Sequence, residues 1–316
     1  MTEMNAIRAH RRGGPEQLVH EKAPRPRPGA GEILVAVRAA SVTAGELGWD
    51  ATWTDSFDGS GRDRTPIIPS HEFSGVVAER GDGVTGPREG EEVYGLIPFT
   101  RDGAAAEYAT VPADVVAAKP ASLSHDGAAA VPLAALTAWQ ALVDHAGVRP
   151  GTRVLVHGGA GGVGSFVVQI AAALGAEVVA TVGPADLGFV TSLGAGTAVD
   201  YVHERFEDRT GPVDVVVDLV GGRTMDRSWD VLAPGGVLVG IAAPPDQREA
   251  ARRGVRAVFF VVEPDRAALE SISELIEDGR LTPAVDRVLP LAQAGAAYEA
   301  LEREHRRGKI VLHVGD

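Results

Sequence analysis

Three glycines at a fixed spacing are the residues of this chain that most clearly indicate chemistry. Gly159, Gly161 and Gly164 have the spacing G-x-G-x-x-G and directly follow the apolar run 154–156. Such glycines allow a sharp turn, a close approach of backbone to a pyrophosphate, and tight packing of the next helix on the strand. The amino end of that helix offers N–H groups to phosphate, so the expected ligand is a dinucleotide. Its predicted contacts in the turn are Gly159, Ala160, Gly161, Gly162 and Val163.

Two other structures are compatible with this stretch. A strand can turn tightly into a helix without binding any ligand. The run 154–176 also contains no charged residue, apart from His157 if it is protonated, which is the composition of a membrane span. Because the glycines interrupt a continuous helix, the segment favours two buried elements over one spanning helix.

The elements around the turn alternate between strand and helix. Strands are predicted at 154–157, 177–181, 214–219, 236–241 and 256–262, with helices between most of them. Valine-rich strands in such an alternation predict an α/β fold, with a parallel sheet covered on both faces.

The parts of the chain before and after this region have a different pattern. From 6 to 120 short β-prone segments alternate with turn clusters, which predicts a β-rich unit. The predicted strands are 33–37, 73–78, 92–96 and 105–111, and 41–64 is expected to be an irregular loop or broken helix. Towards the end we expect helices at 263–278 and 293–305 and a strand at 309–314.

Composition excludes several classes of function. The 316 residues are enough for two domains, and a formal net charge of −13 argues against nucleic acid and anionic membranes as partners. The absence of cysteine excludes disulfides, a cysteine nucleophile and thiolate zinc sites. No apolar signal-peptide core follows the first residues, so a cytoplasmic location is expected.

Several segments together resemble the medium-chain dehydrogenase/reductase superfamily, in its zinc-free quinone oxidoreductase branch. They are AASVTAGELG, PIIPSHEFSGVVAERGDGV, GEEVYGL, GAAAEYATVP, AVPLAALTAWQAL, VLVHGGAGGVG, SLGAGTAVDY, DLVGG and GKIVLHV, in the order of the family. The resemblance implies a GroES-like β-rich catalytic domain at 1–121 and 284–316. It implies a Rossmann domain, a doubly wound parallel sheet, at 122–283.

The resemblance also indicates whether a zinc ion is expected. Zinc-dependent members have a cysteine at the position of Thr43, a His–Glu pair at His71 and Glu72, and a second cysteine near Leu133. This chain keeps the pair and lacks both sulfurs, which leaves a poor tetrahedral site. We expect no metal, and a turn or hydrogen-bond network held by His71 and Glu72.

The cofactor is expected to be NADPH. Folds specific for NAD place an acidic residue about 20 residues beyond the glycine turn. Thr181, Val182 and Gly183 stand there, and the later Asp186 is expected to face solvent. Tyr201 matches a family tyrosine near the adenosine phosphate, with a half-buried aromatic at a strand end as the alternative. The cofactor contacts that the resemblance implies beyond the turn are Thr137, Thr181, Gly183, Tyr201, Val220, Ile241, Ala242, Ala243, Phe260, Val261, Val262 and Lys309.

The resemblance implies hydride transfer to a quinone, or to the C=C bond of an α,β-unsaturated carbonyl, without a metal. Thr43 stands where this branch often has asparagine and is expected to donate a hydrogen bond to the substrate or the nicotinamide. Tyr94 is a candidate proton donor, with a structural role as the alternative. Trp49, Trp53 and Phe99 are expected to form an apolar wall for a flat substrate.

Two other functions remain open at this point. A non-catalytic NADP(H)-binding sensor or structural protein would have the same cofactor site, because fold does not ensure turnover. A zinc-type alcohol dehydrogenase is disfavoured by the missing cysteines. We also expect a homodimer joined through the extended segment 255–262, whose N–H and C=O groups would otherwise be open, with burial inside the monomer as the alternative.

Overall fold

The computed structural model describes residues 2–56 and 60–315. Its contacts divide the chain into two compact units. The terminal unit consists of residues 1–133, 263–277 and 283–316, and the central unit consists of residues 134–262 and 278–282.

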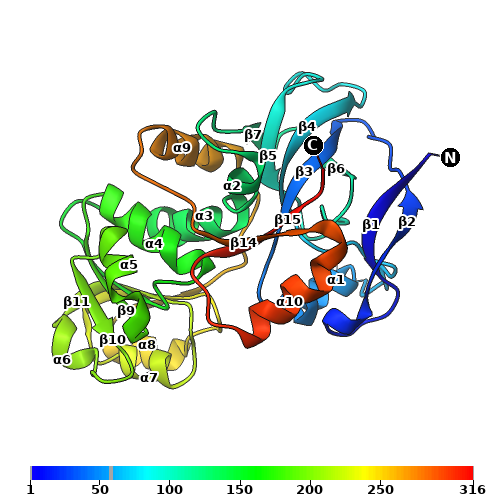
Figure 1. Ribbon diagram of the computed structural model, residues 1–316. Coiled ribbons are helices and arrows are strands. Elements are labelled where there is room, and N and C mark those ends of the chain that lie inside the picture. The colour runs from blue at the N-terminus through cyan, green and yellow to red at the C-terminus, as the bar shows by residue number, and fades with distance from the viewer. Residues whose placement is uncertain (1, 57–59, 316) are drawn as a thin grey trace. The chain divides into compact units, whose positions relative to one another are not determined.

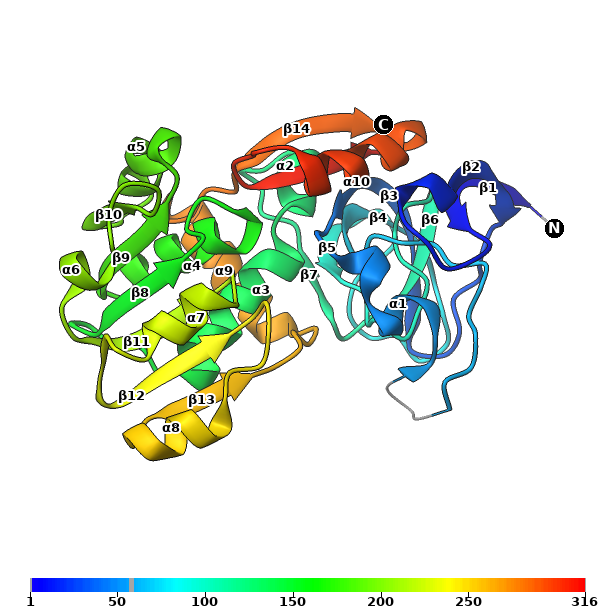
Figure 2. The ribbon, with the colours of Figure 1, turned by 90° about the horizontal axis from the view of Figure 1, so that it is seen from below.

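The described residues of the central unit form a parallel sheet. Its strands are β8 (Arg153–His157), β9 (Glu177–Val182), β10 (Thr197–Asp200), β11 (Val213–Asp218), β12 (Leu232–Gly240) and β13 (Arg256–Phe259). They lie in the order β10-β9-β8-β11-β12-β13, and all neighbouring pairs are parallel (Figure 2). Val154, Leu155 and Val156 have no exposed surface, as expected for a strand covered on both faces.

The helices of the central unit connect these strands. They are α4 (Gly162–Ala173), α5 (Leu187–Ser192), α6 (Glu207–Thr210), α7 (Arg223–Ser228), α8 (Gln247–Arg253) and the 3₁₀ turn η5 (Pro184–Asp186). Helix α3 (Pro132–Trp139) and a π-helical turn (Gln140–His145) precede the sheet. Helix α4 packs on β8 and β9, whereas α7 packs on β11 and β12, so the chain winds outward in both directions from the β8–β11 pair (Figure 2). This is the predicted doubly wound Rossmann arrangement, which the structure confirms.

The terminal unit is built mainly from strands. In its described residues they are β1 (Glu3–Ala9), β2 (Leu18–Pro24), β3 (Glu32–Val42), β4 (Glu72–Arg80), β5 (Glu92–Leu96), β6 (Tyr108–Pro112), β7 (Val116–Ala118), β14 (Val285–Pro290) and β15 (Lys309–His313). The main sheet has the order β14-β15-β3-β4-β5-β7, with β6 also paired to β3, and β1 pairs with β2. Strand β3 therefore pairs with β4 and β6 of the N-terminal part and with β15 of the tail (Figure 1).

Helices of the terminal unit cover the strands and bring in the tail. They are α1 (Asp50–Trp53), α2 (His125–Ala129), α9 (Arg266–Glu277), α10 (Ala294–Arg303) and the 3₁₀ turns η1 (Pro15–Gln17), η2 (Glu46–Gly48) and η6 (Leu291–Gln293). Tyr298 and Leu301 of α10 enter one core cluster with Met4, Ile7 and Trp53. Burial of such side chains contributes about 1.5–3 kcal/mol each, which ties the tail to the N-terminal strands.

The unit boundaries differ from those expected from the sequence. Residues 122–133 and 263–277, which the sequence assigned to the central domain, lie with the terminal unit. The physical reason is packing, because α2 rests on β3 and β4 and α9 rests on β7. In the described residues, no helix is both long enough and apolar enough to cross a bilayer.

Candidate functional site

The glycine turn lies at the carboxyl end of β8, where the strand order of the central sheet reverses. Open α/β sheets bind ligands at such a switch point. A Cβ atom on Gly164 would lie 2.1 Å from the carbonyl oxygen of Gly158, so only glycine allows α4 to approach the turn this closely. Residues 161–163 are half-exposed at the start of α4, where backbone N–H groups lack intrahelical partners. The turn therefore fits a dinucleotide pyrophosphate.

The loop after β11 lies beside this turn, and the loop after β12 lies beside the loop after β11. A Cβ atom on Gly158 would be 3.4 Å from Val220 Cγ2, and one on Gly221 would be 3.6 Å from Ala242 Cβ and 3.7 Å from Ala243 Cβ. Asp218 holds the first of these loops, because its Oδ1 accepts the N–H groups of Val220 at 2.8 Å and Gly221 at 2.9 Å. Of the predicted contacts, Val220 thus lies beside the glycine turn, and Ala242 and Ala243 lie beside Gly221 in the loop that holds Val220. The Ile241 N–H donates to the Asp218 carbonyl at 2.9 Å.

His157 supports the glycine turn through Thr181, which accepts the N–H groups of Gly158 and Gly159. The sequence did not predict this role. Thr181 Oγ1 lies 3.0 Å from His157 Nδ1, and Ser228 Oγ lies 3.0 Å from Nε2. Since the Ser228 hydroxyl donates to the Thr224 carbonyl, Nε2 carries the histidine proton and Nδ1 accepts from Thr181. Burial lowers the pKa of His157 to about 3, so the ring is neutral. A polar residue inside an apolar strand was the available signal.

The predicted 2′-phosphate region contains Gly183 and Tyr201. Tyr201 is 64% exposed at the end of β10, and its hydroxyl would be 3.8 Å from a Cβ atom on Gly183. The expectation that Asp186 faces solvent is wrong, because this residue is 1% exposed. Its carboxylate is turned into the fold by the 3₁₀ turn 184–186, so the surface beside Gly183 is not acidic at this residue.

The remaining predicted contacts of the central unit have mixed exposure. Thr137 is 4% and Val262 is 8% exposed, which leaves little of either side chain for a ligand. Val261 is 48% exposed, and the Phe260 ring packs on His145 with 4.4 Å between centroids. The segment after β13 therefore presents Val261 and the backbone around it.

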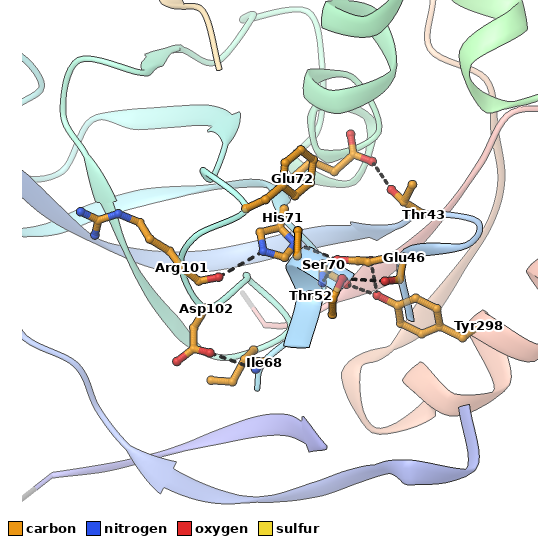
Figure 3. Close-up of polar contacts among 12 residues, drawn as sticks. Thr43, Glu46, Thr52, Ile68, Ser70, His71, Glu72, Arg101, Asp102 and Tyr298 are labelled. Carbon is orange, nitrogen blue, oxygen red and sulfur yellow. Dashed lines mark hydrogen bonds and ion pairs between the residues drawn. The ribbon is translucent and has the colours of Figure 1, made fainter. Parts of the chain in front are cut away.

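A separate polar network lies inside the terminal unit (Figure 3). Glu46 is its centre: Oε1 accepts the Ser70 N–H at 2.9 Å and faces His71 Nδ1 at 2.8 Å, and Oε2 accepts the Tyr298 hydroxyl at 2.6 Å. Ser70 has a positive φ of 68°, a strained conformation that its bond to Glu46 helps to hold. The sequence gave no signal for the contact between Glu46 and Tyr298, which are 252 residues apart.

The two ring nitrogens of His71 both face acceptors. Nδ1 points to Glu46, and Nε2 lies 3.1 Å from the carbonyl oxygen of Arg101 (Figure 3). Both ring nitrogens are therefore engaged by oxygen atoms of this network, which leaves neither of them placed to bind a metal.

Glu72 faces a different set of partners from those of His71. Its Oε1 is 2.5 Å from Lys309 Nζ and 3.5 Å from Thr43 Oγ1, and its Oε2 accepts the Leu133 N–H at 3.0 Å. Burial raises the pKa of the Glu72 carboxyl, and the Lys309 ammonium opposes that rise. The prediction that His71 and Glu72 serve a hydrogen-bond network agrees with these contacts.

A tetrahedral zinc ion does not fit these residues. His71 is used at both nitrogens, and Glu72 holds an ammonium. Among the described residues, no group of three or more His, Cys, Asp or Glu side chains could hold a metal.

The predicted substrate wall is only partly assembled. Trp49 and Phe99 meet edge to face with 5.6 Å between ring centroids, and Phe99 also packs on His71 at 5.0 Å. Trp53 is not part of this wall, because it is 2% exposed and its Nε1 donates to the Leu47 carbonyl in the core.

The Tyr94 hydroxyl makes its contacts with helix α9 and not with Thr43. Its side chain has no exposed surface, and its hydroxyl donates to the Leu269 carbonyl at 2.8 Å and lies 2.7 Å from Ser273 Oγ. These partners attach α9 to β5, and burial raises the pKa of Tyr94. The structure therefore favours the structural alternative over a proton donor.

Comparisons with known proteins agree with this architecture. The family model for the alcohol dehydrogenase GroES-like domain matches residues 29–121, and that for zinc-binding dehydrogenases matches residues 193–312. The chain is 33% identical to a probable zinc-binding mitochondrial oxidoreductase of Arthroderma benhamiae, over 94% of this chain and 93% of that protein.

Two further similarities concern proteins whose names state an activity. The chain is 34% identical to a chloroplastic NADPH-dependent alkenal/one oxidoreductase of Arabidopsis thaliana, over 78% of this chain and 64% of that protein. The solved structure of the quinone oxidoreductase from Coxiella burnetii has a TM-score of 0.90 at 31% identity, covering 99% of this chain and 100% of that one.

Proposed function

This chain belongs to the medium-chain dehydrogenase/reductase superfamily and is consistent with its zinc-free, quinone oxidoreductase-like branch, and from this premise we propose that it reduces quinones or α,β-unsaturated carbonyls with NADPH. That it is an oxidoreductase with a nicotinamide cofactor follows from the relatives. The choice of NADPH and the substrate class are the parts that we propose.

The observation that carries the proposal is the glycine turn at the β8–β11 switch point. N–H groups at the start of α4 would hold the pyrophosphate, and Val220 and 242–243 would flank the cofactor. When bound, NADPH would supply a hydride. The protein's own part is then to hold the acceptor carbon at the correct position and to stabilise charge on the carbonyl oxygen.

Two features support NADPH over NADH. Gly183 stands where folds specific for NAD place an acidic residue, and Asp186 is turned into the fold. The exposed Tyr201 hydroxyl lies beside Gly183 and can donate to a 2′-phosphate. The name of the Arabidopsis relative includes NADPH, which agrees with this assignment.

The substrate side is assigned to the terminal unit. Trp49, which is 36% exposed and packs edge to face on the buried Phe99 ring, presents an apolar surface suited to a flat quinone or enone. Thr43 is half-exposed, and its hydroxyl can donate to the carbonyl oxygen. These two features favour a conjugated carbonyl substrate.

We further propose a cytoplasmic homodimer joined through β13. In the described residues β13 pairs with β12 alone and is the edge of the parallel sheet. Phe259 is 45% and Val261 is 48% exposed there, and a second copy would cover both side chains and the open edge.

Kinetics with a panel of acceptors test the proposed function. Purified protein is mixed with NADPH or NADH, and absorbance at 340 nm is followed with quinones, enones, enals and simple alcohols. We expect NADPH oxidation with at least one conjugated carbonyl and a higher kcat/KM than with NADH. Binding of NADPH without oxidation of it across the panel would support a sensor, and preference for NADH would contradict the cofactor assignment.

A further inference from the structure

Three side chains of the terminal unit form a path from the interior to the surface. Glu72 is fully buried at the start of β4, Lys309 is 5% exposed at the start of β15, and Thr43 is half-exposed just after β3. Strand pairing fixes their positions, because Ser41 lies opposite Glu72 and Val42 lies opposite Ile310. The three side chains are therefore positioned by one continuous sheet.

The Lys309 ammonium has two partners among the described residues. Its Nζ is 2.5 Å from Glu72 Oε1 and 3.3 Å from Thr43 Oγ1. A buried ion pair adds little to stability compared with apolar side chains of similar volume, because removal of both charges from water is costly. Stability alone therefore does not account for a lysine and a glutamate at these positions.

The contacts of the Thr43 hydroxyl indicate which bond it accepts and which it can donate. Its oxygen accepts from Lys309, and its own proton has only a 3.5 Å contact with Glu72, which is the outer limit of a hydrogen bond. A hydroxyl that accepts a charge-assisted bond becomes a stronger donor in turn. Thr43 is the half-exposed member of the three, whereas Glu72 and Lys309 are buried, so its hydroxyl is the group through which the pair can act on a ligand.

We propose that the Lys309–Glu72 pair polarises Thr43 into an oxyanion donor for the substrate carbonyl. This inference rests on the proposed function. Bound NADPH would supply a hydride, which is two electrons and a proton, to the β-carbon, and the C=C electron pair would move towards oxygen. The Thr43 hydroxyl would donate a hydrogen bond to the enolate oxygen that results. Water then supplies a proton to the α-carbon, which gives the saturated carbonyl and oxidised nicotinamide. Lys309 is a positioning residue, because it acts through Thr43.

Variants separate this role from a structural one. Thr43→Val removes the hydroxyl at constant shape and should lower kcat about 100-fold, while Thr43→Ser should retain most activity. Lys309→Met alone leaves Glu72 buried without its cation and should lower Tm. The double variant Lys309→Met/Glu72→Gln removes both charges, so it should recover Tm but keep a kcat lowered at least about tenfold.

A double-mutant cycle tests whether Lys309 acts through Thr43. In a Thr43→Val background, the Lys309→Met/Glu72→Gln pair should cause no further loss of kcat. If the loss of kcat in the combined variant equals the product of the two separate losses, the two sites act independently and the proposal is contradicted. The matched control is Lys119→Met/Glu92→Gln, a second Lys–Glu pair of this unit with 3.2 Å between Nζ and Oε2, which should leave kcat unchanged.

A spectroscopic measurement tests the oxyanion site without turnover. 4-Nitrophenol is titrated into the wild-type protein, and the absorbance of its phenolate is followed across pH. We expect bound nitrophenol to ionise at lower pH than free nitrophenol, and Thr43→Val and the double variant to lose this effect. Failure of wild-type protein to bind or ionise the probe would overturn the inference even if enone reduction occurs. Phenolate stabilisation without any reductase activity would instead contradict only the proposed function.

Discussion

His157 Nδ1 lies 3.0 Å from Thr181 Oγ1, and this contact joins the ends of β8 and β9 directly beneath the glycine turn. The same Thr181 accepts the N–H groups of Gly158 and Gly159 on its carbonyl oxygen at 3.2 Å. The shape of the candidate pyrophosphate site therefore depends on a histidine that stays neutral.

Acid is expected to destabilise the central unit through His157. Burial lowers the pKa of this residue to about 3, from an ordinary value of 6.5. The unfolded chain takes up the proton near pH 6.5, so the stability is complete above that pH. It is lost as the pH falls towards 3, by about 1.4 kcal/mol per pH unit. Through this group, thermal melts should show a nearly constant Tm from pH 7.5 to about 6.5 and a steadily falling Tm from there to pH 5.

A non-titrating variant checks the origin of this slope. His157→Gln should be less stable than wild type at pH 7.5, by about 1–3 kcal/mol, because its buried partners are left poorly bonded. Between pH 6.5 and 5 its stability should fall less steeply than that of the wild type. His20→Gln, at an exposed position, should keep the wild-type slope. Equal slopes in His157→Gln and wild type would assign the acid effect to other groups.

Tyr94→Phe is expected to change stability and to leave catalysis intact. The hydroxyl donates to the Leu269 carbonyl and contacts Ser273 Oγ, so its removal leaves buried polar atoms of α9 without that partner. Unfolding should become easier by about 1–2 kcal/mol, measured by denaturant titration. The kcat of the folded variant should equal that of wild type, and a loss of kcat at unchanged KM would restore Tyr94 as a proton donor.

Cofactor choice is expected to depend on Gly183 and Tyr201. Tyr201→Phe removes an exposed hydroxyl and should raise the Kd for NADPH about threefold to tenfold, with little change for NADH. Gly183→Asp has a suitable backbone, with φ −70° and ψ 160°, and adds a carboxylate near the Tyr201 hydroxyl. This substitution should raise the Kd for NADPH at least about tenfold, because the carboxylate repels the 2′-phosphate.

Fluorescence titration of both cofactors measures these affinities without turnover. Gly188→Asp is the matched control, because a Cβ atom there meets open space in the neighbouring helix α5. It adds the same charge a few residues away and should disturb NADPH binding less than Gly183→Asp. Equal effects of both substitutions would point to long-range charge and not to a phosphate at Gly183.

Local patterns predicted the sheets, but not the distant partners in the polar network. The valine run of β8 and the glycine spacing depend on neighbouring residues, so the sequence alone located the turn and its ligand class. The bond from Tyr298 to Glu46 joins residues 252 positions apart, and no local pattern encodes such a distance. The burial of Tyr94 and Trp53 has no local signal for a similar reason, since exposure depends on which distant helix or loop covers a side chain.

The edge strand β13 is expected to join two copies of the chain. Phe259→Asp places a charge on an exposed ring position of this edge and should convert the proposed dimer into a monomer, because the carboxylate would have to lose its water at the interface. Sedimentation velocity at micromolar concentration measures the mass directly. Val19→Asp is the control, since Val19 is also 45% exposed but lies on β2 of the terminal unit, and it should leave the mass unchanged. A wild-type protein that sediments as a monomer would show that the open edge of β13 is tolerated in solution.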